Sequence, residues 1–267
     1  MDNPEAALND YRRALRLGAN EWRAYHRLVE FYNERGDHAQ ALEIAETGVS
    51  NVPGSYVLQL GYAKTLLFNR RYTASLSLLD TITILPFEGA RYGRELYRQV
   101  CVLSAGEAMK NGRYHNAIEL LSKARQWPER LGVGRPYEVD DRLEDYLQAL
   151  CLRKLGEQAK ARGLLEKVAS YSQEHGTDWG GLRLIGALAL RALGHDADAR
   201  KSVAEWVKRD PKNAAAKWSS LVFAKQRRQS QKVELQIRNG FRGSLLSKGS
   251  IDQNFALMME IQSLLVF

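Results

Sequence analysis

Residues 22–55 read WRAYHRLVEFYNERGDHAQALEIAETGVSNVPGS, and they contain a complete two-helix pattern. The first half has an apolar stripe at helical spacing, formed by Tyr25, Leu28, Val29 and Tyr32. The second half has small residues along one helix face: Ala41, Ala45 and Gly48. Gly36 supplies a turn between the halves, and Pro53 ends the second helix. The stretch therefore predicts two antiparallel helices joined by a tight turn.

The same pattern recurs along the chain. Small residues that begin the second helix of each unit are first 34 residues apart, at Ala7, Ala41 and Ser75. They continue with spacings of 42, 44 and 38 residues, at Ala117, Ala161 and Ala199. This period resembles the tetratricopeptide repeat (TPR) family, whose units are helix hairpins. The resemblance implies an all-α solenoid, a right-handed superhelix of helix hairpins.

The repeats divide the chain into an array and a C-terminal part. The array comprises a half repeat at 4–18, repeats near 22–55, 56–89, 90–131, 140–175 and 180–213, and a last helix at 213–226. A basic linker at 227–250 and an apolar C-terminal helix at 251–267 are expected to follow. Residues 4–18 match only the second helix of a unit. A fragment of a longer polypeptide is therefore favoured over a natural single helix that caps the array.

The turns of the hairpins differ in chemistry. Glycines stand in register at most of them: Gly36, Gly112, Gly156 and Gly194. The third unit has Arg70-Arg71-Tyr72 at its turn instead. Its hairpin should survive with a costlier turn, because glycine alone adopts left-handed backbone without strain.

Composition places the chain among soluble proteins. No secretory segment opens it, and no apolar run reaches the ~20 residues needed to cross a membrane, so a cytoplasmic protein is expected. Cys101 and Cys151 fall near apolar stripes, where a thiol behaves as a small apolar side chain, so a disulfide is disfavoured. The sequence has no metal-ligand spacing.

Positive charge is concentrated near the C-terminus. Between Pro211 and Ser250 there are nine Lys or Arg residues and one acid, Glu234, against a net charge of +8 for the whole chain. Such a block suits nucleic acid or an acidic partner, although basic runs are more often solvated surface. Nucleic acid is unlikely as a partner, because Phe223 and Phe241 give no dense aromatic interleaving.

The sequence contains no recognisable catalytic arrangement. The five histidines are scattered over separate repeats, without an orienting acid and a nucleophile nearby. Asp140, Asp141, Glu144 and Asp145 have the positions of capping charges at a helix start. Gly132-Val133-Gly134 and Trp179-Gly180-Gly181 lack the context of a nucleotide site. We therefore expect no enzymatic activity, no cofactor and no metal.

Three stretches suggest a narrower resemblance. Leu85–Gly89, the long helix that ends in Asn111-Gly112-Arg113-Tyr114, and Trp127–Pro136 resemble segments of the TPR region in large bacterial proteins that carry a galactose-mutarotase-like β-sandwich of unknown function. The resemblance covers roughly residues 20 to 210 and departs at Phe87 and Arg130. It implies a carbohydrate-related parent protein whose sugar chemistry lies outside this chain, and it assigns no catalytic residue here.

First-helix residues on the concave face are the candidate partner-binding groove. They are Leu60, Lys64, Phe68, Val102, Met109, Lys110, Tyr146, Leu150, Arg153, Lys154, Leu188 and Arg191. An open groove of this kind would be an apolar binding patch with basic edges. The alternative is that segments of the chain itself fill it. A role as a chaperone-tail adaptor is disfavoured, since Arg23, His26 and Glu30 replace the carboxylate-clamping pattern.

The C-terminal segment is too apolar to remain free in water. It contains Phe255, Met258, Ile261, Leu264 and Phe267 among other apolar residues. We expect it to dock as a cap on the last repeat, with the concave groove of its own chain or another subunit as alternatives. The sequence thus predicts a non-catalytic scaffold for protein, peptide or interdomain contacts, in which homo-oligomers are possible. The alternative is an accessory TPR region of a carbohydrate-active protein.

Overall fold

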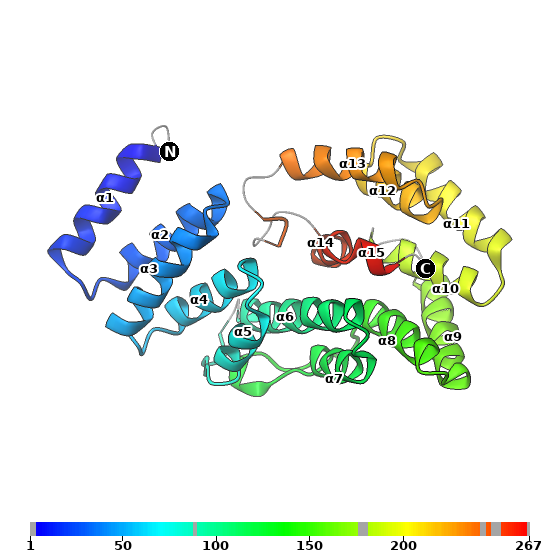
Figure 1. Cartoon of the computed structure of the whole chain (residues 1–267), viewed down its shortest axis with the longest axis horizontal. Coiled ribbons are helices and arrows are strands. Elements are labelled where there is room, and N and C mark those ends of the chain that lie inside the picture. Colours follow the sequence, from blue (N-terminus) through cyan, green and yellow to red (C-terminus); the bar gives the residue numbers. More distant parts are fainter. Residues whose placement is uncertain (1–3, 88–89, 176–180, 241–243, 247–251, 266–267) are drawn as a thin grey trace. The chain divides into compact units, whose positions relative to one another are not determined.

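The computed structural model describes residues 4–87, 90–175, 181–240, 244–246 and 252–265, and these contain helices and no strand (Figure 1). The first helices are α1 (Pro4–Leu17), α2 (Trp22–Arg35), α3 (His38–Asn51), α4 (Tyr56–Phe68), α5 (Tyr72–Leu79), α6 (Arg91–Lys110) and α7 (Tyr114–Ala124). After the 3-10 turn η1 (Glu129–Leu131) come α8 (Arg142–Lys154), α9 (Gln158–Glu174), α10 (Leu182–Ala192) and α11 (Asp196–Arg209). The last are α12 (Ala214–Phe223), α13 (Arg227–Asn239), α14 (Gln253–Glu260) and α15 (Gln262–Leu265).

The chain forms two compact units. Unit 1 comprises residues 1–100, 127–135 and 242–244, and unit 2 comprises residues 101–126, 136–241 and 245–267. Within both, consecutive helices pair into antiparallel hairpins, as the repeat pattern predicts. The chain is therefore an all-α, TPR-like solenoid.

Each hairpin turn contains one residue in the left-handed conformation. Four of these residues are the expected glycines, with φ of 80° at Gly36, 70° at Gly112, 81° at Gly156 and 95° at Gly194. The other two are Arg70 at 57° and Lys225 at 56°. In each turn the next backbone N–H donates back to the ending helix, as from Arg71 to the Leu66 carbonyl at 2.9 Å. The costlier turn expected at Arg70 is confirmed, and Lys225 adds a second one.

Replacing Arg70 with glycine should stabilise the fold. Relief of the left-handed strain, about 1–2 kcal/mol, outweighs the extra backbone freedom that glycine gives the unfolded chain, about 0.5–1 kcal/mol. We expect urea titration to show a gain of roughly 0.5–1 kcal/mol for Arg70→Gly. Gly156→Ala is the matched control. It should lower the free energy of unfolding by about as much as Arg70→Gly raises it. A loss in Arg70→Gly comparable to that of an ordinary helical glycine substitution would contradict the assignment.

Small residues hold the hairpins together. Ala41, Ala117, Ala161 and Ala199 are fully buried where the second helix of each hairpin meets the first. Ser75 takes the same position, and its hydroxyl donates to the Ala63 carbonyl at 2.7 Å, which satisfies the buried oxygen. This burial confirms the register that the repeat spacing predicted.

Residues 227–239 are helical, which corrects the expected basic linker. They form α13, which packs against α12 in the last hairpin. Its buried stripe is Ser230, Val233 and Ile237, while Arg227 and Arg228 are exposed. The helix that was expected at 213–226 without a partner is thus the first helix of a complete hairpin. The segment was predicted to be a linker because its many basic residues lie on the solvent face, and its apolar stripe is short.

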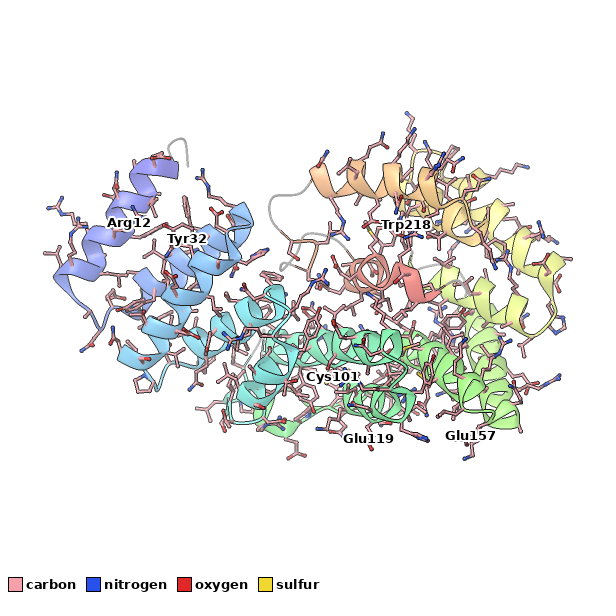
Figure 2. All side chains as sticks on the ribbon, viewed as in Figure 1. Arg12, Tyr32, Cys101, Glu119, Glu157 and Trp218 are labelled. Atoms are coloured by element: carbon pink, nitrogen blue, oxygen red, sulfur yellow. The ribbon has the colours of Figure 1, made fainter. Side chains whose placement is uncertain are left out.

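The helix α1 packs on unit 1 through one face. Leu8, Tyr11 and Leu15 contact the cluster of Leu28, Tyr32 and Ala41. Arg12 also donates to the Tyr32 hydroxyl at 2.8 Å, and Figure 2 labels both residues (Figure 2). The half repeat therefore extends the hydrophobic layer of the first complete hairpin.

The second inserted stretch packs on residues that flank the first one in unit 1. The Ile84 N–H donates to the Arg130 carbonyl at 2.7 Å, and the Arg130 guanidinium forms an ion pair with Asp80 at 2.6 Å. Leu131 is fully buried, and the Arg94 guanidinium lies 4.4 Å from the centre of the Trp127 ring. Residues 127–131 of the second insertion are therefore packed on residues 80–84 and on α6. Glu88 and Gly89 lie outside the described residues.

Candidate binding groove

The first helices of unit 2 are buried on more than one face. Along α8, the residues from Arg142 to Leu152 are all buried except Gln148, which is half-buried. One face packs on the paired helix α9, but a single partner cannot cover a helix all round. The helix also packs on α7 and α10. The C-terminal segment adds a further cover, and Figure 1 shows α14 and α15 between α6 and α13.

Apolar side chains hold the C-terminal segment in unit 2. A Cβ built on Gly106 would lie 3.1 Å from Ile261 and 3.3 Å from Leu264, so those side chains press directly on the α6 backbone. A Cβ on Gly181 would lie 2.9 Å from the Cβ of Phe255 and 3.0 Å from its Cα. No side chain larger than hydrogen fits at position 181 without moving α14.

An aromatic contact fixes the start of the segment. The Phe255 ring meets Trp218 of α12 edge to face, with ring centres 5.2 Å apart and an interplanar angle of 88°. Both side chains are fully buried, and such a pair contributes about 0.5–1.5 kcal/mol beyond its buried area. Asp252 caps α14, since its carboxylate accepts the Phe255 N–H at 2.7 Å.

Three polar contacts fix the orientation of the segment. The Tyr146 hydroxyl of α8 donates to the Leu265 carbonyl at 3.0 Å, and burial raises the pKa of this tyrosine. The Gln262 amide donates to the Ser230 hydroxyl at 2.9 Å, and the Arg238 guanidinium donates to Glu260 at 2.9 Å. The last two contacts come from α13, so the segment touches both ends of the unit 2 array.

This placement differs from the expected cap. The contacts run from α6 and α8 to α12 and α13 instead of stopping at the last repeat. The end of the array is completed by α13 itself. The groove of its own chain, one of the two alternatives to the cap, is therefore the site that the segment occupies. Val266 and Phe267 lie outside the described residues.

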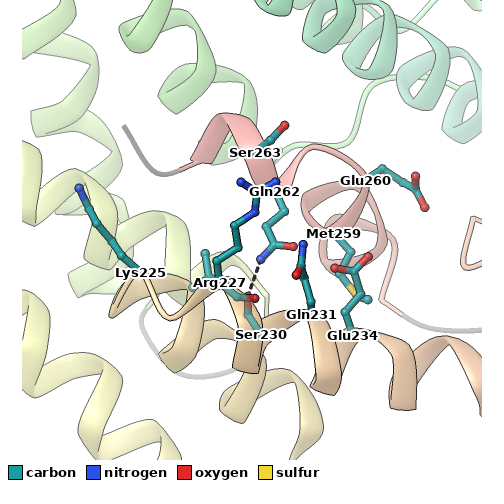
Figure 3. A pocket seen from close by; sticks show the side chains of 10 residues that line it. Lys225, Arg227, Ser230, Gln231, Glu234, Met259, Glu260, Gln262 and Ser263 are labelled. Carbon is teal, nitrogen blue, oxygen red and sulfur yellow. Dashed lines mark hydrogen bonds between the residues drawn. The ribbon is translucent and has the colours of Figure 1, made fainter.

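A cleft remains open beside the seated segment. It has a volume of about 430 Å³ and lies between α13 and the C-terminal helices, as Figure 3 shows (Figure 3). Its wall combines cations, carboxylates and amides: Lys225, Arg227, Gln231, Glu234, Glu260 and Gln262. Met259 adds an apolar side chain. The outer flank of the segment is therefore polar and accessible, whereas its inner flank is closely packed.

Most of the predicted groove residues are covered. In unit 2 the buried ones are Val102, Met109, Tyr146, Leu150 and Leu188. At its edge, the exposed ones are Lys110, Arg153 and Lys154. Arg191 is half-buried and donates to the Phe223 carbonyl at 2.7 Å, so it ties α10 to α12. Leu60 and Lys64 of unit 1 are buried, and Phe68 is half-buried.

Lys64 belongs to a buried polar cluster in unit 1 and is not a groove cation. Its ammonium donates to the Gln99 carbonyl oxygen at 2.9 Å and lies 5.1 Å from the Phe68 ring centre. Burial lowers the pKa of Lys64 from 10.5 to about 7, and Glu95 partly opposes that shift. Nearby, Asn33 donates to the Thr65 hydroxyl at 2.9 Å. The prediction that Lys64 is a cation of an open groove is therefore wrong, because its side chain is buried.

The buried lysine should make stability depend on pH. The unfolded chain holds this proton up to about 10.5, and the folded chain releases it near 7. The unfolded state thus binds more protons across this window, so stability rises as the pH rises through it. We expect Lys64→Met to remove that part of the rise, measured by urea unfolding across the window. The exposed Lys110→Met variant should keep the wild-type profile, and equal slopes in all three proteins would contradict the prediction.

Two of the four acids expected to cap α8, Asp140 and Asp145, also form ion pairs. Asp140 accepts the Arg142 backbone N–H at 3.2 Å, which is a capping contact, but it also binds the Arg142 guanidinium at 2.6 Å. Asp145 pairs with Arg125 at 2.7 Å and with Lys167 at 2.8 Å. Asp141 makes no side-chain capping bond. The ion pairs of Asp145 link α8 to Arg125 at the end of α7 and to Lys167 of α9.

The chemistry expected of an active site or metal centre is not seen among the residues described. Cys101 and Cys151 are free and buried, and burial raises the pKa of the Cys151 thiol to about 12. No group of three or more His, Cys, Asp or Glu side chains within the described ranges could hold a metal ion. Of the helices described, none is long and apolar enough to cross a membrane. The strongest candidate site is thus the apolar groove of unit 2.

Comparison with known proteins supports the repeat and gives no information about a ligand. No curated protein matches the sequence. A solved structure described as "Functional Characterization of Pseudomonas Aeruginosa pilF" is similar over 84% of this chain and 93% of that one, with 20% identity and a TM-score of 0.42. A likeness so distant carries no inference about function. Neither finding supports the resemblance to regions that follow a galactose-mutarotase-like domain.

One family model matches within unit 2. It is that of the tetratricopeptide repeat, and it covers residues 145–173. These residues fall in α8 and α9, which form one of the antiparallel hairpins beneath the C-terminal segment. The hairpin that carries Tyr146 and Leu150 is therefore similar to a tetratricopeptide repeat.

Proposed function

We propose that this chain is a non-catalytic scaffold that binds protein partners through the concave faces of its helix hairpins. The observation that carries the proposal is the groove of unit 2, which holds a helix by apolar contacts and a few oriented polar ones. In helix-in-groove recognition, apolar anchors provide affinity and polar groups fix the orientation of the helix. The TPR hairpin at residues 145–173 supports the same role.

Nucleic acid is the less favoured ligand. Arg227, Arg228 and Lys232 are exposed on α13, but Arg238 is engaged with Glu234 and Glu260. Exposed aromatic side chains, on which bases would stack, do not accompany these cations on α13. This surface is consistent with a solvated face or with an acidic stretch of a protein partner.

An accessory role in a carbohydrate-active protein is the alternative. It rests on the sequence resemblance around Leu85–Gly89 and Trp127–Pro136. The contacts of Ile84 with Arg130 and of Arg94 with Trp127 hold the second insertion on unit 1 without any sugar. We therefore keep the protein scaffold as the leading proposal.

The proposal can be tested by offering three ligand classes to the full chain. A displayed library of helical peptides should yield binders, whereas oligosaccharides and single-stranded oligonucleotides should not bind at physiological salt. Arg228→Glu with Lys232→Glu is the discriminating variant. It should leave peptide binding intact and abolish any residual, steeply salt-dependent binding of oligonucleotides. Failure to enrich any peptide, or tight binding of a sugar or nucleic acid, would reject the proposal.

A further inference from the structure

The C-terminal segment packs in the way a bound helix packs in a groove. Its anchors are Phe255, Met258, Ile261 and Leu264, which recur every third residue along α14 and α15. The first two meet Gly181, and the last two meet Gly106. Phe255 and Met258 lie one turn apart on α14, whereas Ile261 follows the end of α14 and Leu264 lies in α15, so the two pairs of anchors contact two different parts of the groove. Apolar anchors set into a groove are the means by which grooves bind helices of partner proteins.

The groove is built independently of this segment. Each of its first helices already has its own hairpin partner, in the pairs α8 with α9, α10 with α11 and α12 with α13. Removing α14 and α15 therefore leaves the layers of the array in place and exposes an apolar face. Replacement by another apolar helix would cover that face again.

The flank of the segment that faces the open cleft is weakly fixed. The Arg238 and Glu260 side chains remain 34% and 28% exposed, and an ion pair at such exposure contributes little. The Gln262 amide and the Ser263 side chain border the cleft of about 430 Å³. A competing helix can approach from this side while the inner anchors are still seated.

From these observations we propose that the unit 2 groove is a binding site for an amphipathic helix of a partner protein, and that residues 252–265 occupy it in cis as a displaceable ligand. The inference rests on the proposed scaffold function. It specifies the partner segment as a helix with an aromatic residue followed by aliphatic residues at every third position. An acid on its outer flank pairs with Arg238.

Two features of the groove set this specificity. Gly181 requires the partner backbone to approach closely, because a side chain there would overlap the Cα position of Phe255. Trp218 then receives the aromatic anchor edge to face. At the far end, the Tyr146 hydroxyl binds a backbone carbonyl, which any sequence can supply. The groove therefore selects partners by their apolar anchors and by the acid. The end of the partner helix is bound through its backbone, so its sequence does not matter there.

The test uses a fluorescent peptide with the sequence of residues 252–265, DQNFALMMEIQSLL, acetylated and amidated, added to the full chain. In the wild type the cis segment competes, so the apparent affinity is reduced by the small fraction of open groove. Phe255→Ala weakens the cis segment and leaves the groove unchanged. It should tighten peptide binding by at least about tenfold. A peptide that carries the same Phe-to-Ala change should show a far smaller increase in affinity between wild type and Phe255→Ala.

A milder variant protects the test against misfolding. Glu260→Arg places two cations together on the half-exposed flank and removes no apolar contact, so it should open the groove without a cavity. It should bind the unmodified peptide several-fold more tightly than wild type does. Adding Gly181→Leu to either variant should abolish binding, because the added side chain fills the close approach.

The inference fails if neither variant binds the peptide more tightly than wild type while circular dichroism shows unchanged helix content. The segment would then be a permanent part of the core. That result leaves the scaffold function standing if library peptides still bind elsewhere on the chain. Failure of the library selection, by contrast, would reject the scaffold function itself.

Discussion

Ala161→Arg should destabilise unit 2 more than any surface substitution. Ala161 is 1% exposed in α9, where the second helix of its hairpin meets α8. An arginine side chain there must force the helices apart, at about 1–3 kcal/mol, and must also bury its charge without a partner. We expect a loss of at least roughly 3 kcal/mol, measured by the shift of the unfolding midpoint in urea.

Ala159→Arg is the matched control, because Ala159 lies on the exposed face of the same helix. It should change stability by less than about 0.5 kcal/mol. If both variants melt alike, or if Ala161→Arg melts as wild type does, the repeat register is wrong. The same comparison can be repeated in α7, where Ala117 holds the equivalent buried position.

Local sequence determined the hairpins, and this part of the structure could be predicted. Turn geometry depends on one residue with positive φ, so Gly36 and Gly156 mark their turns directly. Close helix contact requires a small side chain, so Ala117 and Ala161 give the register. Both signals act within a single hairpin and need no knowledge of distant residues.

The last hairpin was missed because both of its signals are altered. Its turn residue is Lys225 instead of glycine, and its small residue is Ser230, only 31 positions after Ala199. The exposed cations of α13 then dominate any reading of charge. A search for an apolar stripe of helical period would have found Val233 and Ile237.

The occupant of the groove could not be derived from the repeat pattern. Periodicity shows that α8 and the C-terminal segment each have an apolar face, but it does not say which faces meet. Gly181 was the residue in the sequence that could have indicated this contact, but it was considered only as part of a possible nucleotide-binding motif. Its function in the structure is to let the Phe255 backbone approach. Such contacts join residues far apart in sequence, so they require the tertiary fold.

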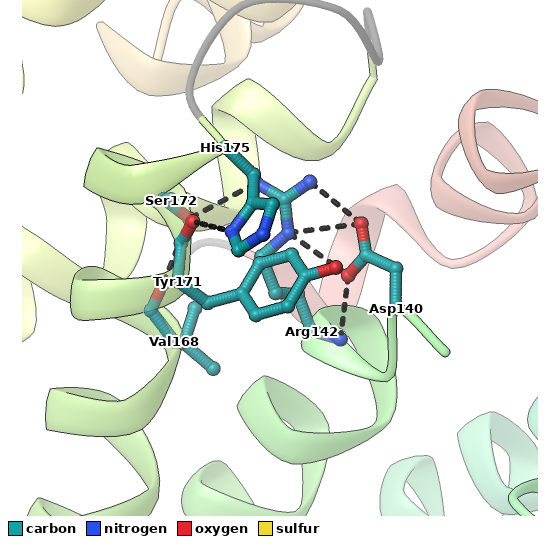
Figure 4. A network of polar contacts seen from close by, with 6 residues as sticks. All are labelled: Asp140, Arg142, Val168, Tyr171, Ser172 and His175. Carbon is teal, nitrogen blue, oxygen red and sulfur yellow. Dashed lines mark hydrogen bonds and ion pairs between the residues drawn. The ribbon is translucent and has the colours of Figure 1, made fainter. Parts of the chain in front are cut away.

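Arg142 is a buried charged residue whose stability depends on one ion pair. It starts α8, and its side chain is 4% exposed. Its guanidinium binds both oxygens of Asp140, donates to the Ser172 hydroxyl at 3.1 Å and lies 5.1 Å from the Tyr171 ring centre. Figure 4 shows these side chains converging on the guanidinium (Figure 4). The carboxylate of Asp140 is the anion that balances this charge.

Asp140→Ala should therefore cost about 3 kcal/mol, because it leaves a buried guanidinium without its carboxylate. Removing both charges should cost much less, since a buried ion pair contributes little net stability over apolar side chains of similar volume. We expect the Asp140→Ala, Arg142→Met double variant to recover most of the loss, with a coupling energy of roughly 1–3 kcal/mol in the double-mutant cycle. Urea unfolding of the four proteins measures this. Additive losses would show that Asp140 acts mainly as the backbone cap of α8.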